Sequence, residues 1–417
     1  MPRFASPPLS AGTSPEAALS VSPAAAGPSI AHAVAGVHFA AIDPQGNVAP
    51  GLNFAAQDYL SLAGHPALRA AATAANPQQG LTAPAVMLED RVARFLHLPE
   101  AVVFASGTDA IRATLRCTLR AGDQVIVDGG AHPAMFETVV AACATLHRAP
   151  PGSLDAVERR LRRLAAQPRR GRLFVAVPAV SAHASVIADL AGLVDLCRDH
   201  GATLIVDVTH DLGSMAQGGG GVLEIQGCLG RTGIVIGSFA KCFGAAGGFA
   251  AFRDPALTQA LRRSHHGQRP SAAISPVNVA TILAAFDLVD SAQGRNRRRR
   301  LHSSALRLRN HLMADGIRVM GQPSPLVPVR LPMTTAQART ALLESAGVLV
   351  TLLAAPAVAS HAPRWRLQLM ADHSAADIDD LADLIRDVTR VFDRQRRPAR
   401  SHTAPLVQIP LAQTPPT

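Results

Sequence analysis

The sequence predicts an α/β protein with a large mixed or parallel sheet and helices on both faces. Short apolar segments recur at residues 101–105, 124–127, 172–177 and 203–206, and segments with helical spacing, such as 87–98 and 190–200, separate them. Alternation of buried strands with amphipathic helices is typical of βαβ units. Ligands of such sheets bind where the strands end, so polar residues at those positions become candidate site residues.

The chain has 417 residues, which is more than one ordinary core accommodates. We therefore expect a large domain at 87–290, preceded by an N-terminal segment at 36–86. A smaller C-terminal α+β domain at 291–395 is predicted from short apolar strands at 318–321, 325–331, 347–353 and 364–369 and from a last helix at 376–393. Residues 1–35 and 396–417 carry few large apolar side chains, which predicts flexible tails.

Composition argues against nucleic acid as a partner, although the net charge is +10. Aromatic residues make up only 4% of the chain, so platforms for base stacking are scarce, and the arginines are spread over many predicted helices. The densest basic run is Arg297–Arg300, which we interpret as the solvated face of a helix. We expect no nucleic-acid binding.

The five cysteines show no metal-like spacing and no CxxC pair, which indicates reduced thiols and a cytoplasmic protein. No apolar run reaches the roughly 20 residues of a membrane span, and the first residues lack the apolar core of a signal peptide. We therefore expect no membrane span and no metal site.

Lys241 is the only lysine in the chain, and the other 39 of the 40 basic residues are arginines. It lies in GSFAKCFGAAGG (237–248), between an apolar strand and a glycine-rich turn. Arginine supplies charge, whereas a desolvated lysine supplies a nucleophilic amine. Lys241 is therefore a candidate covalent site, the alternative being one leftover surface lysine.

Other polar residues also follow predicted strands. Ser106-Gly107-Thr108 opens a helix, where free backbone amides suit a phosphate, although such turns also simply join strands to helices. Asp207 ends one strand and His210 follows it; a helix-capping role for Asp207 is the alternative. His132 opens a further helix, and Tyr59, the only tyrosine, is interpreted as structural.

Together these positions offer an amine, a carboxylate, two imidazoles and a phosphate-type turn. Pyridoxal phosphate needs a lysine, an acid for its pyridine nitrogen, a flat side chain against its ring, and hydroxyls and amides for its phosphate. No hydrolase motif or metal spacing competes with this interpretation.

Three motifs, VFASGTDA (103–110), VDVTHDLG (206–213) and GSFAKCFGAAGG (237–248), resemble those of the α-oxoamine synthases. The resemblance runs from about Asn53 to Val388. It implies the aspartate-aminotransferase-like fold type I, a homodimer and pyridoxal 5'-phosphate as cofactor. It also implies decarboxylating condensation of an amino acid with an acyl thioester, which gives an α-aminoketone.

The resemblance assigns roles around the cofactor ring. Lys241 matches the lysine that binds the cofactor covalently, and Asp207 matches the partner of the pyridine nitrogen. His132 matches the residue that stacks on the ring, and His210 and Ser181 match those that hydrogen-bond its phenolic oxygen.

It also assigns roles at the two ends of the site. Gly107, Thr108 and Ser238 match positions that hold the phosphate. Arg366, in RWRLQLMADH (364–373), matches the arginine that binds the substrate carboxylate, although by itself it reads as a surface arginine.

The sequence departs from the family pattern at several places, among them Gln57, Val208 and Ser271, and two of these departures are segments. Residues 75–88 are shorter by roughly a dozen residues than the family segment near the acyl donor, so a carrier-protein thioester and a coenzyme A ester both stay open. The turn SAHASV (181–186) replaces the usual SMxGx. A pyridoxal-phosphate lyase or aldolase and a non-catalytic partner subunit are the alternatives to a synthase.

Overall fold

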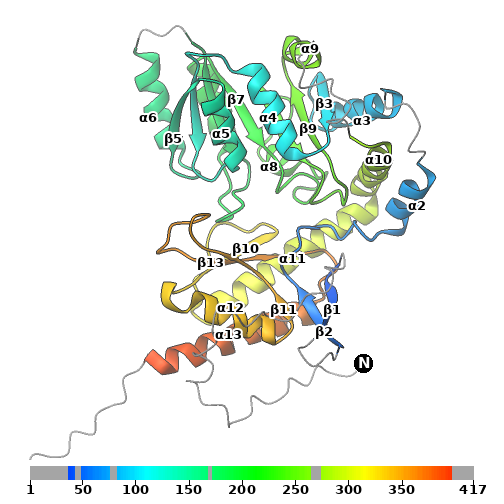
Figure 1. The fold of residues 1–417 in the computed structure, drawn as a ribbon, viewed down its shortest axis with the longest axis vertical. Helices are drawn as coiled ribbons and strands as arrows, with labels where there is room; N and C mark the ends of the chain where they lie inside the picture. Colours follow the sequence, from blue (N-terminus) through cyan, green and yellow to red (C-terminus); the bar gives the residue numbers. More distant parts are fainter. Residues whose placement is uncertain (1–35, 43–47, 76–81, 168–170, 264–273, 397–417) are drawn as a thin grey trace, which may run out of the picture.

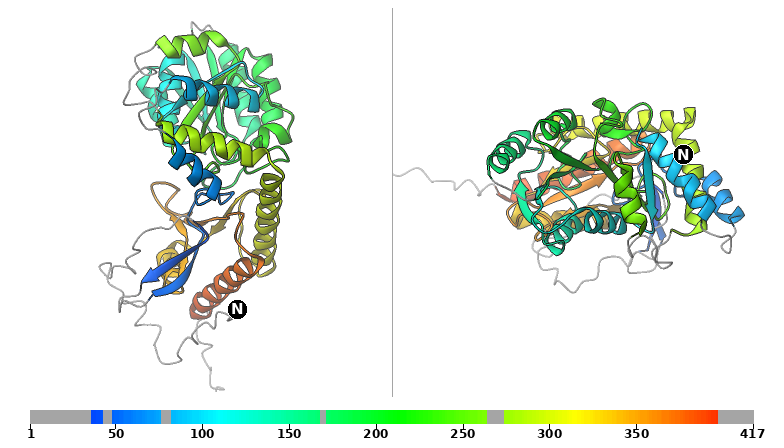
Figure 2. Two further views of the ribbon diagram at one scale, coloured as in Figure 1. Left: turned by 90° about the vertical axis from the view of Figure 1, so that its right-hand side faces the viewer. Right: turned by 90° about the horizontal axis from the view of Figure 1, so that it is seen from above.

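The computed structural model describes residues 36–42, 48–75, 82–167, 171–263 and 274–396. A part with a large sheet and a smaller part are stacked end to end, and helix α11 (Ala292–Ala314) runs from the first along the second (Figures 1 and 2). The tails predicted at 1–35 and 396–417 lie outside the described residues, apart from Arg396, which ends the last helix.

The large sheet has seven strands in the order β3-β9-β8-β7-β6-β4-β5. Only β9 runs antiparallel to its neighbours, so the predicted mixed α/β sheet is confirmed. Its strands are β3 (Glu100–Phe104), β4 (Gln124–Asp128), β5 (Thr145–Ala149), β6 (Leu173–Pro178), β7 (Ala202–Asp207), β8 (Ile234–Ser238) and β9 (Gly248–Phe252).

Two hydrophobic cores cover the two faces of this sheet. Along β4, Val125 and Val127 belong to one core and Ile126 to the other, because successive side chains of a strand point to opposite faces. The first core includes residues of α4 (Gly107–Thr118), α5 (Pro133–Ala141) and α9 (Pro255–Arg263). The second includes residues of α2 (Pro66–Ala74), α3 (Thr82–Phe95), α6 (Leu154–Ala165), α7 (Leu190–Asp199), α8 (Gly221–Ile225) and α10 (Pro276–Asp290).

The smaller part contains two three-stranded sheets. One has the order β10-β13-β12, with β10 (Leu326–Arg330), β12 (Thr351–Leu353) and β13 (Arg364–Gln368) antiparallel. The other joins β1 (His38–Ile42) and β2 (Val48–Asn53) to β11 (Val348–Leu349), which brings the start of the described chain beside its C-terminal part. The short helix η2 (Met333–Thr335), α12 (Ala336–Ser345) and α13 (Ala375–Arg396) complete it. No helix within the described ranges is both long and apolar enough to cross a membrane.

Two strand predictions in this part are wrong. Residues 318–321 form only an isolated pairing of Val319 with Val329, because Gly321 turns the chain away with φ at 64°. Residues 347–353 are not one strand, since β11 and β12 pair with different sheets on either side of Val350.

The interpretation of Arg297–Arg300 as a solvated face is also wrong for its first two residues. Arg298 is 4% exposed and donates to the carbonyls of Val289, at 2.9 Å, and Gln217, at 2.6 Å. Arg297 donates to the carbonyl of Leu60 at 3.0 Å. Backbone carbonyls from distant loops thus compensate for the burial of these guanidinium groups. Arg299 and Arg300 are exposed, as predicted.

Candidate active site

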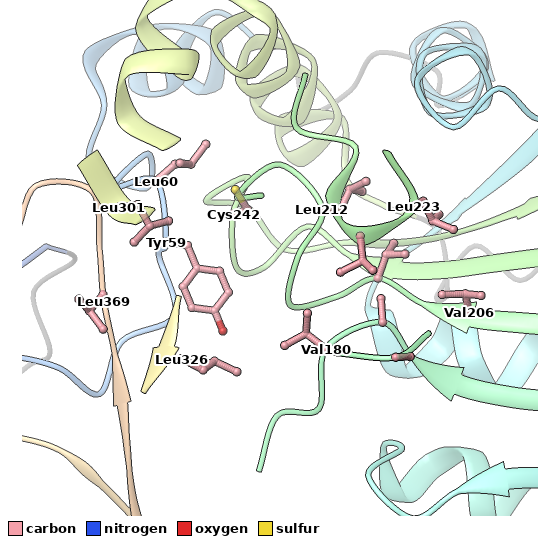
Figure 3. Packing of buried hydrophobic residues seen from close by; sticks show 14 of the residues in the cluster. Tyr59, Leu60, Val180, Val206, Leu212, Leu223, Cys242, Leu301, Leu326 and Leu369 are labelled. Atoms are coloured by element: carbon pink, nitrogen blue, oxygen red, sulfur yellow. The ribbon is translucent and has the colours of Figure 1, made fainter. Parts of the chain in front are cut away.

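The predicted site residues gather at one edge of the large sheet. Strands β4, β7 and β8 end at Asp128, Asp207 and Ser238, and Gly107 comes shortly after the end of β3. These four strands run in the same direction, so their carboxyl ends lie at the same edge. This edge faces the smaller part. Figure 3 shows Tyr59 between Leu326 and Leu369 of the smaller part and Cys242 and Leu212 of the large-sheet loops.

The turn between β3 and α4 is packed tightly against the end of β8. Ser106 caps α4, and its hydroxyl accepts from the Asp109 amide at 3.1 Å. A β-carbon added at Gly107 would lie 2.7 Å from Cβ of Ser238, so only glycine fits there. The amides of Gly107 and Thr108 precede the first amide that donates within the helix, which is that of Ala110, and are therefore free to bind an anion. The structure therefore brings the three predicted phosphate residues together.

Asp207 and Lys241 form the charged centre of this edge. Asp207 is 7% exposed, and its Oδ1 accepts from the Thr209 amide at 3.0 Å. Burial lowers the pKa of the Lys241 amine, the charge of Asp207 raises it, and that of Arg366 lowers it again. A lowered pKa increases the fraction of neutral amine, which is the nucleophilic form.

His210 occupies the middle of the cluster. Burial lowers the pKa of its imidazole well below the ordinary value, and the charges of Lys241, Arg366, His183 and His132 each lower it further. These four groups therefore lie close enough to the half-buried imidazole to act on its charge. The imidazole of His210 is therefore neutral at physiological pH.

Arg366 lies in the middle of β13, in register with Pro328 and Thr351. Its Nε is buried and has no hydrogen-bond partner among the described residues. Burial lowers the pKa of its guanidinium. A half-buried guanidinium with unused donors is suited to bind a carboxylate from outside the chain. By itself the sequence suggested a surface arginine, whereas the side chain is half-buried and its Nε is inaccessible to solvent.

His132 and Ser181 lie on neighbouring loops, and Asp128 holds the loop of His132 in place. The Asp128 carboxylate accepts from the amides of Gly130 and Gly152, both at 2.7 Å. A β-carbon at Gly130 would lie 2.8 Å from Oγ of Ser181, so the two loops touch. His132 caps α5 and is exposed, which leaves its ring free to contact a ligand.

The unusual turn at 181–186 connects the large sheet to the smaller part. The Ser185 hydroxyl donates to the carbonyl of Gln322 at 2.8 Å and lies 2.7 Å from Oγ of Ser324. The Gln322 amide donates to the Ser185 carbonyl at 2.8 Å. Arg364, two residues from Arg366 on β13, donates to the carbonyl of His183 at 3.3 Å.

Three residues near the site carried no functional prediction. Tyr59 is fully buried, and its hydroxyl lies 2.8 Å from Nδ1 of His210. His183 acts electrostatically on His210, as described above. The pKa of Asp211 is raised to about 8, mainly because the carboxyl group is buried. The hydrogen bond from the Val222 amide opposes this rise, and the charge of Asp207 adds to it. The solitary tyrosine was the only sequence signal among the three.

The arrangement offers a half-buried amine on which a carboxylate acts, a helix N-terminus with free amides and a guanidinium whose Nε has no hydrogen-bond partner among the described residues. This donor set fits pyridoxal phosphate with an amino acid bound to it. Within the described ranges, no group of three or more His, Cys, Asp or Glu side chains could hold a metal ion.

The family model for aminotransferase class I and II matches residues 49–385. The chain belongs to this family. Among the curated members, 8-amino-7-oxononanoate synthase of Geobacter metallireducens is 31% identical over 77% of this chain and 84% of its own length. The 2-amino-3-ketobutyrate coenzyme A ligase of Escherichia coli is 29% identical over 78% of this chain and 84% of its own length. The predicted relationship to the α-oxoamine synthases is confirmed.

Solved structures of this aminotransferase family share the fold. A serine palmitoyltransferase from S. paucimobilis superposes with a TM-score of 0.77 at 23% identity, and the match covers 85% of this chain and 90% of that one. The 8-amino-7-oxononanoate synthase of Francisella tularensis superposes with a TM-score of 0.72 at 19% identity, and the match covers 82% of this chain and 99% of that one. The aspartate-aminotransferase-like fold is thereby confirmed.

Proposed function

We propose that this chain is a pyridoxal-phosphate-dependent C-acyltransferase that condenses an amino acid with an acyl thioester and releases carbon dioxide, giving an α-aminoketone. The observation that carries the proposal is the only lysine of the chain, half-buried in the loop after β8, where the charges of Asp207 and Arg366 act on it. The names of the relatives support the reaction class, since they include an oxononanoate synthase and a coenzyme A ligase.

In this proposal the edge of the sheet holds the cofactor, which when bound accepts the electrons released at the α-carbon of an amino acid. Gly107, Thr108 and Ser238 bind its phosphate, and Asp207 keeps its pyridine nitrogen protonated. Lys241 binds it covalently.

Four further side chains act on the ring and the substrate. His132 packs against the ring, while Ser181 and His210 hydrogen-bond the phenolic oxygen. Arg366 binds the substrate carboxylate with two parallel donors. Lys241, with its lowered pKa, is the base that takes the α-proton.

The acyl donor, the assembly and the location are finer parts of the proposal. The coenzyme A ligase among the relatives favours a coenzyme A ester over a carrier-protein thioester. All five cysteines are free thiols, which supports a cytoplasmic location. A homodimer follows from the resemblance alone, and sedimentation equilibrium of the purified protein tests it.

A two-substrate assay tests the reaction. The purified protein is incubated with pyridoxal phosphate, a panel of amino acids and acyl thioesters of coenzyme A or of a carrier protein, while free thiol and carbon dioxide are measured. The proposal requires that both products depend on both substrates. Amino-acid cleavage without a thioester would identify a lyase instead.

Two variants separate substrate binding from chemistry. Arg366→Lys keeps the positive charge but loses the two-pronged geometry, so we expect a higher KM for the amino acid. Arg364→Lys changes a neighbouring guanidinium that bonds the His183 carbonyl and serves as the matched control. Equal effects of the two variants would argue against a substrate-binding role for Arg366.

A further inference from the structure

Tyr59 and His210 form a part-buried hydrogen bond that the proposed roles leave unexplained. The tyrosine hydroxyl lies 2.8 Å from Nδ1 of the imidazole, and the two residues are 151 positions apart in the sequence. The ring of Tyr59 is fully buried, so water does not satisfy its hydroxyl. The direction of this hydrogen bond determines which nitrogen of His210 carries the proton.

The surroundings of Tyr59 hold its hydroxyl in place. The Asp58 carboxylate accepts from the amides of Leu62, at 2.8 Å, and Ala63, at 3.0 Å, and so closes the turn that follows Tyr59. The carbonyl of Tyr59 accepts from the Ala371 amide at 2.8 Å. The phenol therefore has a fixed position on the boundary between the two parts of the molecule.

The tyrosine must be the donor in this pair. Burial raises the pKa of the phenol, so it keeps its proton, and its hydroxyl has no partner other than His210 among the described residues. If the phenol accepted from Nδ1, its own proton would be buried without an acceptor, which is unfavourable. The imidazole is neutral, because burial, Lys241 and Arg366 all lower its pKa. With Nδ1 as acceptor, the single ring proton lies on Nε2.

We infer that Tyr59 is a positioning residue that fixes His210 as the Nε2-protonated tautomer, so that His210 can only donate a hydrogen bond into the cofactor site. The inference rests on the proposed function for the identity of the acceptor there, the phenolic oxygen of pyridoxal phosphate. The tautomer itself follows from the Tyr59 contact and does not depend on the cofactor. A donating imidazole stabilises an anionic phenolic oxygen, whereas the other tautomer would present a lone pair and repel it.

Tyr59→Phe removes the hydroxyl and keeps the ring. We expect it to release the constraint on the tautomer and to weaken binding of pyridoxal phosphate by about 2- to 12-fold, the worth of one net hydrogen bond. The absorbance maximum of the bound cofactor should shift as well, because its phenolic oxygen loses a fixed donor. Thr281→Val is the matched control, since it removes a buried hydroxyl that donates to the Val277 carbonyl at 2.7 Å within α10.

The decisive readout is NMR of isotope-labelled histidine in the cofactor-free protein, with His210→Gln assigning the signals. An unprotonated Nδ1 and a protonated Nε2 in the wild type, lost in Tyr59→Phe and kept in Thr281→Val, would support the inference. A protonated Nδ1 in the wild type would overturn it, even if Tyr59→Phe failed to fold. An unchanged tautomer and an unchanged cofactor spectrum in Tyr59→Phe would also overturn it. A wild type that shows the predicted tautomer but does not bind pyridoxal phosphate would refute the proposed function alone.

Discussion

The contact between Gly107 and Ser238 makes the anion-binding turn sensitive to a single methyl group. In Gly107→Ala the new Cβ would lie 2.7 Å from Cβ, 3.1 Å from Oγ and 3.4 Å from Cα of Ser238. Ser238 cannot rotate away, because its Cβ is fixed by the backbone of β8. Overpacking of this kind costs about 1–3 kcal/mol. Alanine is the better helix former, so without the contact the substitution would be neutral or slightly stabilising.

The overpacking would push apart the turn at Gly107 and the end of β8, the two segments that hold the phosphate in the proposed site. If the whole cost of about 1–3 kcal/mol appears as lost binding energy, the affinity for pyridoxal phosphate falls by about 5- to 150-fold. Titration of the cofactor-free protein, followed by absorbance, measures this change. Gly64→Ala is the matched control, since its Cβ would meet nothing within 4 Å. Equal affinity and equal urea stability of the two variants would refute the reasoning.

Three further changes have defined outcomes. Asp207→Asn should fold but lower turnover by about 100- to 1,000-fold, the typical loss of one preorganised electrostatic group, and turnover within threefold of the wild type would contradict its role. Ser185→Ala should lower the free energy of unfolding in urea by about 1–3 kcal/mol, because the partners of a buried hydroxyl lose their bonds; a change below about 0.5 kcal/mol would contradict that contact. Burial lowers the pKa of His373 from 6.5 to about 4, so the unfolded chain binds more protons below pH 6.5. The contribution of the neutral His373 to the free energy of unfolding is fully present above pH 6.5. It declines by up to about 1.4 kcal/mol per pH unit as the pH falls toward 4. His373→Gln should remove this slope from the free energy of unfolding measured in acid.

The sequence predicted where the strand-end residues lie, because their signals are local, and their roles in binding stay predictions. Asp207 ends an apolar strand, and Lys241 and Gly107 lie in the turns that follow two others. Parallel strands bring such positions to one edge without knowledge of any distant contact. The mixed sheet and its two covered faces followed from the same alternation.

Contacts between distant segments escaped prediction. Tyr59 meets a histidine 151 positions away. Arg298 is buried because carbonyls 81 and 85 positions away, at Gln217 and Gly213, accept its protons. Neither partner leaves a trace in the local pattern of hydrophobic and charged residues. The split of residues 347–353 between two sheets has the same origin, since β2 and β13 each pair with only one half of the segment.

The chain carries one lysine, so its only candidate amines for covalent attachment of the cofactor are Lys241 and the α-amino group. Reduction with borohydride makes the attachment permanent, and trypsin then leaves Lys241 inside the peptide 232–253, because a modified lysine is not cleaved. We predict that mass spectrometry finds the reduced cofactor on this peptide in the wild type and finds no modified peptide in Lys241→Arg. Reduced cofactor on the α-amino group alone, or an unmodified protein cleaved after Lys241, would contradict the central claim that Lys241 is the cofactor-binding lysine.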